Sequence, residues 1–310
     1  MAPRCPLWLT AFLLGCVLLG GCPEPLDDDV TAADDDGDDD TADPALWSHV
    51  AAGEYHTCGV RLDGTLACWG RDDYGQASPP GGTFTWVGAG GSNNEAHSCA
   101  IDSGQYVQCW GFGDDGQTDP PGGRYLRLDA GGWHNCALAT DGQVDCWGAD
   151  FSGQATPAPG EYNDVSCGGA HTCAVTVDDE AVCWGHNAND QSTPVPGTYT
   201  QIDAGGLHTC AVHRDGDALG ECWGAPWQDM SIPPPGVGFV TMGLGENHSC
   251  GVTTDAGILC WGESLDGQDD VPEGSYIQVT AGRKHTCGLT TDQRIVCWGS
   301  NDEGQCDVPG

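Results

Sequence analysis

The residues best suited to chemistry in this sequence are a histidine and two cysteines that recur together. A histidine lies two positions before one cysteine, and a second cysteine follows ten or twelve residues later and opens the tripeptide Cys-Trp-Gly, as in His56, Cys58 and Cys68. Such a group allows three chemistries: an imidazole that activates a thiolate nucleophile, a metal site, or a disulfide bond.

The number of copies argues against the first two chemistries. The histidines are His56, His97, His134, His171, His208, His248 and His285. Catalysis needs one exceptional place, and a tetrahedral zinc site needs four close ligands, whereas no unit contains a CxxC pair. The sequence also has no nucleophile elbow, P-loop or dinucleotide fingerprint. We therefore expect no catalytic residue, metal or cofactor, and we interpret each histidine as a turn residue bonded to neighbouring backbone.

The elements that position these residues are short strands. Segments such as 84–90 and 125–131 alternate aromatic or β-branched residues with polar ones, and turns such as Asp63-Gly64 separate the two cysteine-bearing segments. A hairpin of this length places the two cysteines on facing positions, at a separation that suits a disulfide. The expected pairs are Cys58-Cys68, Cys99-Cys109, Cys136-Cys146, Cys173-Cys183, Cys210-Cys222, Cys250-Cys260 and Cys287-Cys297.

The unit recurs with steps of 37 to 41 residues. Three or four antiparallel strands cannot bury their own faces, so seven units are expected to close into a seven-bladed β-propeller. The predicted fold is thus all-β, with one disulfide within each blade. The repeats are placed at about 46–83, 84–124, 125–161, 162–198, 199–238, 239–275 and 276–310.

The sequence before the repeats predicts export. An apolar run over 7–19 ends in Leu19-Gly20-Gly21-Cys22, which resembles the bacterial lipobox, so we expect a lipoprotein signal peptide over 1–21 and a lipid on Cys22. An ordinary signal peptide is the alternative. Residues 22–45 are acidic and contain no basic side chain, which predicts a disordered tether. Calcium binding by 34–40 is the alternative there.

Composition limits the partners and the compartment. The chain has 46 acidic and 9 basic side chains, a formal net charge of −37, which argues against nucleic acid as a partner. Its 19 cysteines indicate an oxidising compartment. Outside the pairs and the N-terminal segment, Cys167 occupies a position held by alanine in other units, so we expect it to be small and buried. Cys306 is expected to be a free or intermolecularly bonded thiol.

The order His-Thr-Cys-Ala-Leu, Asp-Gly, Cys-Trp-Gly and Gly-Gln resembles the repeat of the regulator of chromosome condensation family, in its short bacterial form. The resemblance covers about residues 46–310 and implies a seven-bladed propeller. We do not carry over the nucleotide exchange of the eukaryotic founder, because this chain is predicted to be exported and has no basic face. Three units depart from the pattern: the second through an insertion at 92–96, the fourth through Asn189-Asp190-Gln191, and the fifth at 225–230.

Function is expected where the units differ. The loops before the histidines should project at one end of the ring, where Tyr55, Trp133, Arg283 and Lys284 would form an aromatic and locally cationic rim suited to a protein interface. The full set of candidate partner-binding residues is Tyr55, Asn93, Asn94, Trp133, Asn247, Arg283 and Lys284. A second candidate face carries Tyr74, Phe112, Phe151 and Trp227.

We therefore expect a non-enzymatic, monomeric propeller lipoprotein of the bacterial cell envelope or cell surface. Its partner would be an extracytoplasmic protein or peptide, and its contact with the membrane would be through the lipid only. A module that binds carbohydrate or an envelope polymer is the alternative. A secreted hydrolase with an unrecognised site is a third, less favoured possibility.

Overall fold

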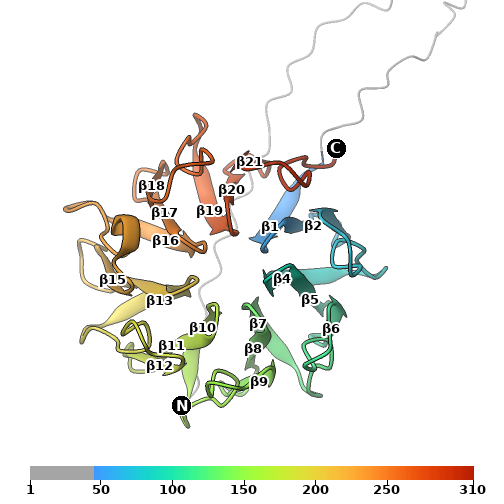
Figure 1. Ribbon diagram of the computed structural model, residues 1–310, viewed down its shortest axis with the longest axis horizontal. Coiled ribbons are helices and arrows are strands. Elements are labelled where there is room, and N and C mark those ends of the chain that lie inside the picture. The colour runs from blue at the N-terminus through green and yellow to red at the C-terminus, as the bar shows by residue number, and fades with distance from the viewer. Residues whose placement is uncertain (1–44) are drawn as a thin grey trace, which may run out of the picture. The chain divides into compact units, whose positions relative to one another are not determined.

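The structure, a computed structural model, describes residues 45–310. The predicted signal peptide, the lipidation site Cys22 and, except for its last residue, the acidic tether lie outside these residues. The described chain forms seven antiparallel sheets of three strands each, arranged as blades around a central axis (Figure 1). The predicted seven-bladed all-β propeller is confirmed, with three strands in every blade.

The strands follow the repeats in order. The first three blades are β1 (Trp47–Ala52), β2 (His56–Arg61) and β3 (Leu66–Gly70); β4 (Phe84–Ser92), β5 (Glu95–Asp102) and β6 (Val107–Gly111); and β7 (Tyr125–Ala130), β8 (His134–Ala139) and β9 (Val144–Gly148). The fourth and fifth are β10 (Tyr162–Cys167), β11 (His171–Thr176) and β12 (Ala181–Gly185); and β13 (Tyr199–Ala204), β14 (His208–His213) and β15 (Gly220–Gly224). The last two are β16 (Phe239–Leu244), β17 (His248–Thr253) and β18 (Ile258–Gly262); and β19 (Tyr276–Ala281), β20 (His285–Thr290) and β21 (Ile295–Gly299).

The only helical element among residues 45–310 is η1, a single 3₁₀ turn at Trp227–Asp229. No helix in this part of the chain is long and apolar enough to cross a membrane.

Each blade is stapled within its outer hairpin. The middle and outer strands pair so that the two cysteines of a unit face each other, as Cys58 and Cys68 do in β2 and β3. All seven expected disulfides are present, with Cα atoms 4.0 or 4.1 Å apart. The disulfides hold the blades individually, and none joins two blades.

The hydrophobic core is divided among the seven interfaces between blades. Every inner strand begins with a buried aromatic residue that packs against the neighbouring blade. Phe84 and Val87 of blade 2, for example, cluster with Cys58 and Val60 of blade 1, and Trp110 packs on this cluster. Burial of such side chains contributes about 1.5–3 kcal/mol each, so the blades depend on one another for their cores.

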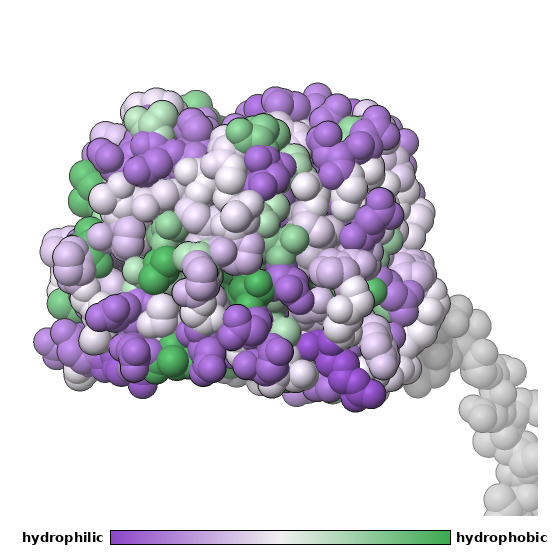
Figure 2. Space-filling view, turned by 90° about the horizontal axis from the view of Figure 1, so that it is seen from below, coloured by the Kyte–Doolittle hydropathy of each residue, from purple (hydrophilic) through white to green (hydrophobic). Residues whose placement is uncertain are grey.

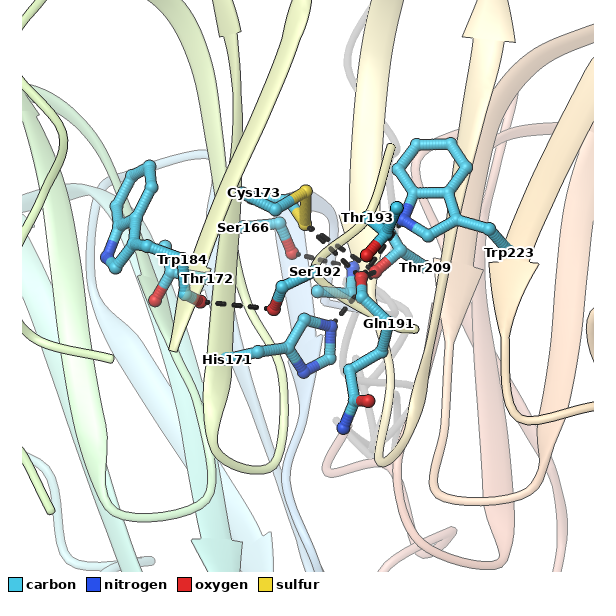
Figure 3. The surroundings of a disulfide bond; sticks show 12 residues. Ser166, His171, Thr172, Cys173, Trp184, Gln191, Ser192, Thr193, Thr209 and Trp223 are labelled. Atoms are coloured by element: carbon cyan, nitrogen blue, oxygen red, sulfur yellow. Dashed lines mark hydrogen bonds between the residues drawn. A yellow bond between two sulfur atoms is a disulfide. The ribbon is translucent and has the colours of Figure 1, made fainter. Parts of the chain in front are cut away.

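A buried polar joint accompanies each of these cores. The histidine donates from Nε2 to a side-chain oxygen of the next blade, as His171 does to Thr209 Oγ1 at 2.9 Å (Figure 3). The hydroxyl of Thr209 donates to the backbone oxygen of Gln191, which also accepts the indole N–H of Trp223. Because a hydroxyl has one proton, the histidine must be the donor in its bond to Thr209 and is therefore the neutral Nε2–H tautomer.

The interpretation of the histidines as turn residues was wrong. They lie at or near the start of the middle strands and are fully or almost fully buried. Their partners lie on the next blade: Ser98, Asn135, Thr172, Thr209, Ser249, Thr286 and Thr57. The last of these contacts joins His285 of blade 7 to Thr57 of blade 1, so the ring closes with the same joint that links all other blades.

The glutamine that follows the Cys-Trp-Gly loop completes the joint. Its buried side chain accepts a backbone N–H two residues earlier, and Gln191 does the same in the unit that lacks Gly-Gln. Only the fifth unit differs, because buried Met230 takes this position and its backbone oxygen still accepts Ser249 and Trp261. The fourth unit therefore keeps the whole glutamine contact although its sequence lacks Gly-Gln. The fifth unit keeps only the contact made by the backbone oxygen.

The two unpaired cysteines of the described residues are Cys167 and Cys306. Cys167 is buried at the end of β10, as expected from its alanine-like position, and burial raises the pKa of its thiol well above the ordinary value. Cys306 is half-buried, and its thiol lies 3.4 Å from the backbone oxygen of Ser300. Burial raises the pKa of Cys306 to about 11, so both side chains are thiols rather than thiolates.

Candidate functional site

The residues that differ between units collect at one end of the ring. In every blade the loop before the histidine and the loop after Cys-Trp-Gly are joined by a backbone hydrogen bond, such as Arg71 N–H to Tyr55 oxygen and Ala149 N–H to Trp133 oxygen, both at 2.9 Å. The two candidate faces expected from the sequence are therefore one surface, which we call the loop end. Seen from the side, the ring shows hydrophilic residues along both edges and scattered hydrophobic ones between them (Figure 2).

A funnel of about 690 Å³ opens at the centre of the loop end. Its floor is formed near the ends of the inner strands by alanine or cysteine in six blades and by Leu244 in the sixth blade, and its wall is largely glycine backbone. Glycine is required there: a Cβ on Gly205 would lie 2.6 Å from the ring of His208 and 2.5 Å from the oxygen of Gly245 in the next blade. The wall therefore offers backbone, and side chains enter only from the rim.

One side of the rim is aromatic. Trp133 and Phe151 of blade 3 meet edge to face with ring centroids 5.6 Å apart, and both line the funnel with Leu207 and Trp227 of blade 5. Phe151 is 67 % exposed and Trp227 54 % exposed. Large aromatic side chains left in water beside a concave site are typical of binding surfaces.

The opposite side of the rim is ionic. Arg283 of blade 7 lies 2.9 Å from Glu54 of blade 1 and 2.7 Å from Glu246 of blade 6. Burial raises the pKa of Glu54, whose side chain is only 4 % exposed. Burial opposes the charge of Arg283, but its carboxylate neighbours outweigh this effect and raise its pKa. Lys284 is paired with Asp266 at 3.0 Å.

The expected cationic rim is therefore not what the structure shows, because carboxylates neutralise both basic residues. Tyr55 lies between the guanidinium groups of Arg71 and Arg283, at 5.7 and 5.5 Å from its ring centre. Arg71 also donates to the side chain of Asn94, whose backbone N–H donates to Glu54. These contacts link the loops of blades 7, 1 and 2, and we call these residues together with Glu246 of blade 6 the ionic arc.

The insertion in the second unit extends a hairpin. β4 and β5 continue to a two-residue turn at Asn93 and Asn94, both with positive φ, as expected of a type I′ turn. Asn93 is exposed and lines the funnel. Asn247 bonds Glu263 within blade 6. Of the seven predicted residues, the structure brings Tyr55, Asn94 and Arg283 into the ionic arc, whereas Trp133 lies across the funnel.

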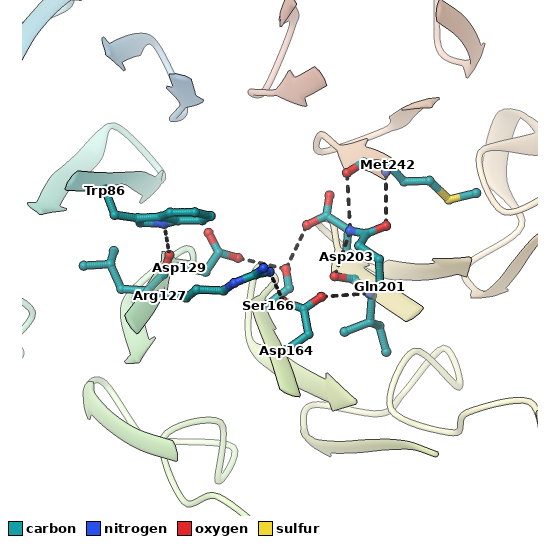
Figure 4. A network of polar contacts seen from close by, with 10 residues as sticks. Trp86, Arg127, Asp129, Asp164, Ser166, Gln201, Asp203 and Met242 are labelled. Atoms are coloured by element: carbon teal, nitrogen blue, oxygen red, sulfur yellow. Dashed lines mark hydrogen bonds and ion pairs between the residues drawn. The ribbon is translucent and has the colours of Figure 1, made fainter. Parts of the chain in front are cut away.

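The space between the inner strands on the side away from the loop end, which we call the channel, holds a second cavity of about 370 Å³, lined by both polar and apolar residues. There Ser166 Oγ lies 2.8 Å from Asp129 and 2.9 Å from Asp203, and it accepts the N–H of Ala204 (Figure 4). Since a hydroxyl donates only one proton, one of the two carboxyls must itself be protonated. Burial raises the pKa of Asp129 and raises that of Asp203 well above the ordinary value. The pair thus shares one proton across Ser166.

Within residues 45–310 a single group could gather three metal-ligating atoms, namely His134, Cys136 and Cys167. It does not suit a metal ion, because the sulfur of Cys136 is already bonded to Cys146, which leaves only His134 and Cys167 as ligands. The same disulfide leaves no thiolate beside the histidine. The recurring His-x-Cys groups are accounted for by the blade framework.

Sequence reasoning missed the residue between histidine and cysteine. It is Thr57, Ser98, Asn135, Thr172, Thr209, Ser249 or Thr286, and it accepts the histidine N–H of the preceding blade. The signal was present, since this position is small and polar in all seven units. It also missed Glu54 and Glu246, which hold Arg283.

The chain is thus a seven-bladed propeller in which all blades share the same strands, disulfide and joint, and differ in the loops at the loop end. The model of the Regulator of chromosome condensation (RCC1) repeat matches residues 47–76, 127–154, 163–191, 239–268 and 276–305. Five of the seven units thus match this repeat, and the chain carries repeats of the family that the sequence resemblance indicated.

Solved structures share the fold. The CRINKLY WD40 ectodomain of the Arabidopsis thaliana receptor kinase ACR4 is 24 % identical, with a TM-score of 0.67 over 82 % of this chain and 98 % of that one. The ectodomain of the Physcomitrella patens receptor kinase CR4 is also 24 % identical, with a TM-score of 0.71 over 83 % and 74 %. Prp20p of Saccharomyces cerevisiae is 15 % identical, with a TM-score of 0.65 over 84 % and 83 %. No curated protein matches the sequence.

Proposed function

We propose that this chain is a non-enzymatic binding scaffold that holds a protein or peptide partner at its loop end. One observation carries the proposal: every recurring His-x-Cys group is used in a joint or a disulfide, whereas the residues that vary surround one funnel. Two of the similar structures are receptor ectodomains, and the structure of Prp20p is described together with its binding to Gsp1p and histones. Propellers of this shape thus serve as binding domains.

The proposal places the scaffold outside the cytoplasm. Seven disulfides in one small domain are typical of an oxidising environment. The lipobox-like sequence supports attachment to a membrane of the cell envelope through Cys22. A Cys22→Ser variant should then move from the membrane to the soluble fraction, and a variant that stays with the membrane would refute the anchor.

Site-specific crosslinking tests the binding surface. A photo-reactive residue in place of Phe151 should capture a protein from an envelope extract, whereas the same residue in place of Val177, which is exposed and lies toward the other end of the ring, should not. Equal capture at both positions, or at neither, would contradict the proposal. Capture of envelope polysaccharide at Phe151 would instead favour the carbohydrate-binding alternative.

A further inference from the structure

The charges of the loop end indicate the chemistry of its partner. The loops before the histidines, together with the segments between Cys-Trp-Gly and the following glutamine or Met230, carry fourteen acidic side chains and three basic ones. The acidic residues are Glu54, Asp72, Asp73, Glu95, Asp114, Asp115, Asp150, Asp190, Asp229, Glu246, Glu263, Asp266, Asp302 and Glu303. Residues 46–310 contain only eight basic side chains, and the other five are Arg61, Arg124, Arg127, Arg214 and Arg294, which lie in the channel or toward the opposite end.

The three basic side chains of this surface are already occupied by carboxylates. Arg71 is paired with Asp73, Arg283 with Glu54 and Glu246, and Lys284 with Asp266. Most of the carboxylates therefore have no cationic partner within the described chain. Glu246 lines the funnel and is 45 % exposed, so it remains accessible to an incoming cation although it pairs with Arg283.

The aromatic side of the rim indicates that the partner also presents an apolar side chain. Phe151 and Trp227 flank blade 4 on either side, and the ionic arc of Glu246, Arg283 and Glu54 lies across the ring from them. Exposed aromatic faces accept apolar side chains and also attract ammonium and guanidinium groups. At about 690 Å³, the funnel has the volume of a pocket that takes a small ligand or a few side chains.

We propose that the loop end binds a basic segment of a partner protein, with an apolar side chain placed in the funnel. That side chain would pack on Trp133, Phe151 and Trp227, while neighbouring lysines or arginines face Glu246 and the outer carboxylates. The inference rests on the proposed function and specifies the partner's chemistry. The many unpaired carboxylates should speed encounter with a cationic partner and make binding sensitive to salt.

A labelled peptide of alternating lysine and phenylalanine tests this inference with the full propeller. Fluorescence anisotropy should show binding at low salt that weakens at high salt, and little binding of a glutamate–phenylalanine or a lysine–serine peptide. Trp227→Ala and Phe151→Ala should each raise Kd about fivefold or more, and Glu246→Gln should raise it less. The matched variants Val177→Ala and Asp217→Asn, at exposed positions toward the opposite end, should leave Kd unchanged.

Two results would overturn the inference. One is equal binding of the acidic and basic peptides, and the other is binding that the loop-end variants leave unchanged. The proposed function is tested separately: if crosslinking at Phe151 captures a protein whose contacting segment is neutral or acidic, the scaffold stands and the basic segment is refuted. If nothing is captured there, the scaffold itself fails.

Discussion

The joints between blades and the loop end differ in how much the seven units vary. At the joints all seven units place the same kinds of group: a neutral histidine, a small polar acceptor, a tryptophan, and a glutamine or, once, a methionine. At the loop end the corresponding positions hold Tyr55, Trp133, Ala170, Leu207 and Lys284, among others. The repeated residues are thus used for stability, which leaves the variable ones free for recognition.

Of the changes considered, a fall in pH should lower the stability of the fold most. Burial lowers the pKa of the seven joint histidines from the ordinary 6.5 to about 3 or 4. The folded state then binds fewer protons than the unfolded state below pH 6.5, so stability is complete above this pH and is lost as the pH falls. The loss is about 1 kcal/mol per pH unit for each histidine.

The buried carboxyls act in the opposite direction. Burial raises the pKa of Asp164 to about 6 and also raises those of Asp129, Asp203 and Glu54, so these four groups favour the folded state as the pH falls toward 4. Seven histidines outweigh four carboxyls. Denaturant unfolding followed by tryptophan fluorescence should show a steep loss of stability between pH 6 and 4. A flat profile would contradict the neutral, buried histidines.

Removal of one disulfide should have the next largest effect. Cys173→Ala with Cys183→Ala opens a loop closed across ten residues of sequence separation, which costs somewhat under 3 kcal/mol in the chain-entropy model. Because no disulfide joins two blades, the ring itself should persist. Thermal unfolding together with small-angle scattering checks both points. Loss of the compact ring in the folded variant would show that the staple does more than stabilise its own blade.

The variant Thr209→Val tests how much a single joint between two blades contributes to stability. The variant keeps the shape but leaves His171 Nε2 and the backbone oxygen of Gln191 without this hydroxyl, at a cost of about 1–3 kcal/mol. Thr200→Val, at an exposed position on β13, is the matched control and should change the free energy of unfolding by less than about 0.5 kcal/mol. Equal effects of the two variants would mean that the joint contributes nothing special.

Phe151→Ala should have the smallest effect on stability. The side chain is mostly exposed, so its removal should change the free energy of unfolding by no more than about 0.5 kcal/mol. The same variant should weaken binding at the loop end. If it instead destabilised the fold as much as Thr209→Val, the separation between framework and recognition surface would be wrong.

The sequence predicted well those contacts that join residues close together in the chain. The ten-residue spacing of Cys58 and Cys68 reflects one hairpin. Six units share this spacing and the fifth has twelve residues, and the seven pairs define the blades and their number. The contact of His171 with Thr209 spans 38 residues, and that of Arg283 with Glu54 spans 229. Such pairings depend on how blades meet and how the ring closes. For this reason the histidine joints and the charge balance of the rim were not foreseen.

The glycine wall of the funnel has an evolutionary consequence. At Gly131, Gly168 and Gly205 a side chain would collide both with a framework histidine and with the next blade. Substitution there damages the ring before it can alter a ligand contact, so lineages of this protein can change their partner only by exchanging rim residues. Duplicated copies of the gene should accordingly share an almost invariant funnel interior and diverge in the loops above it.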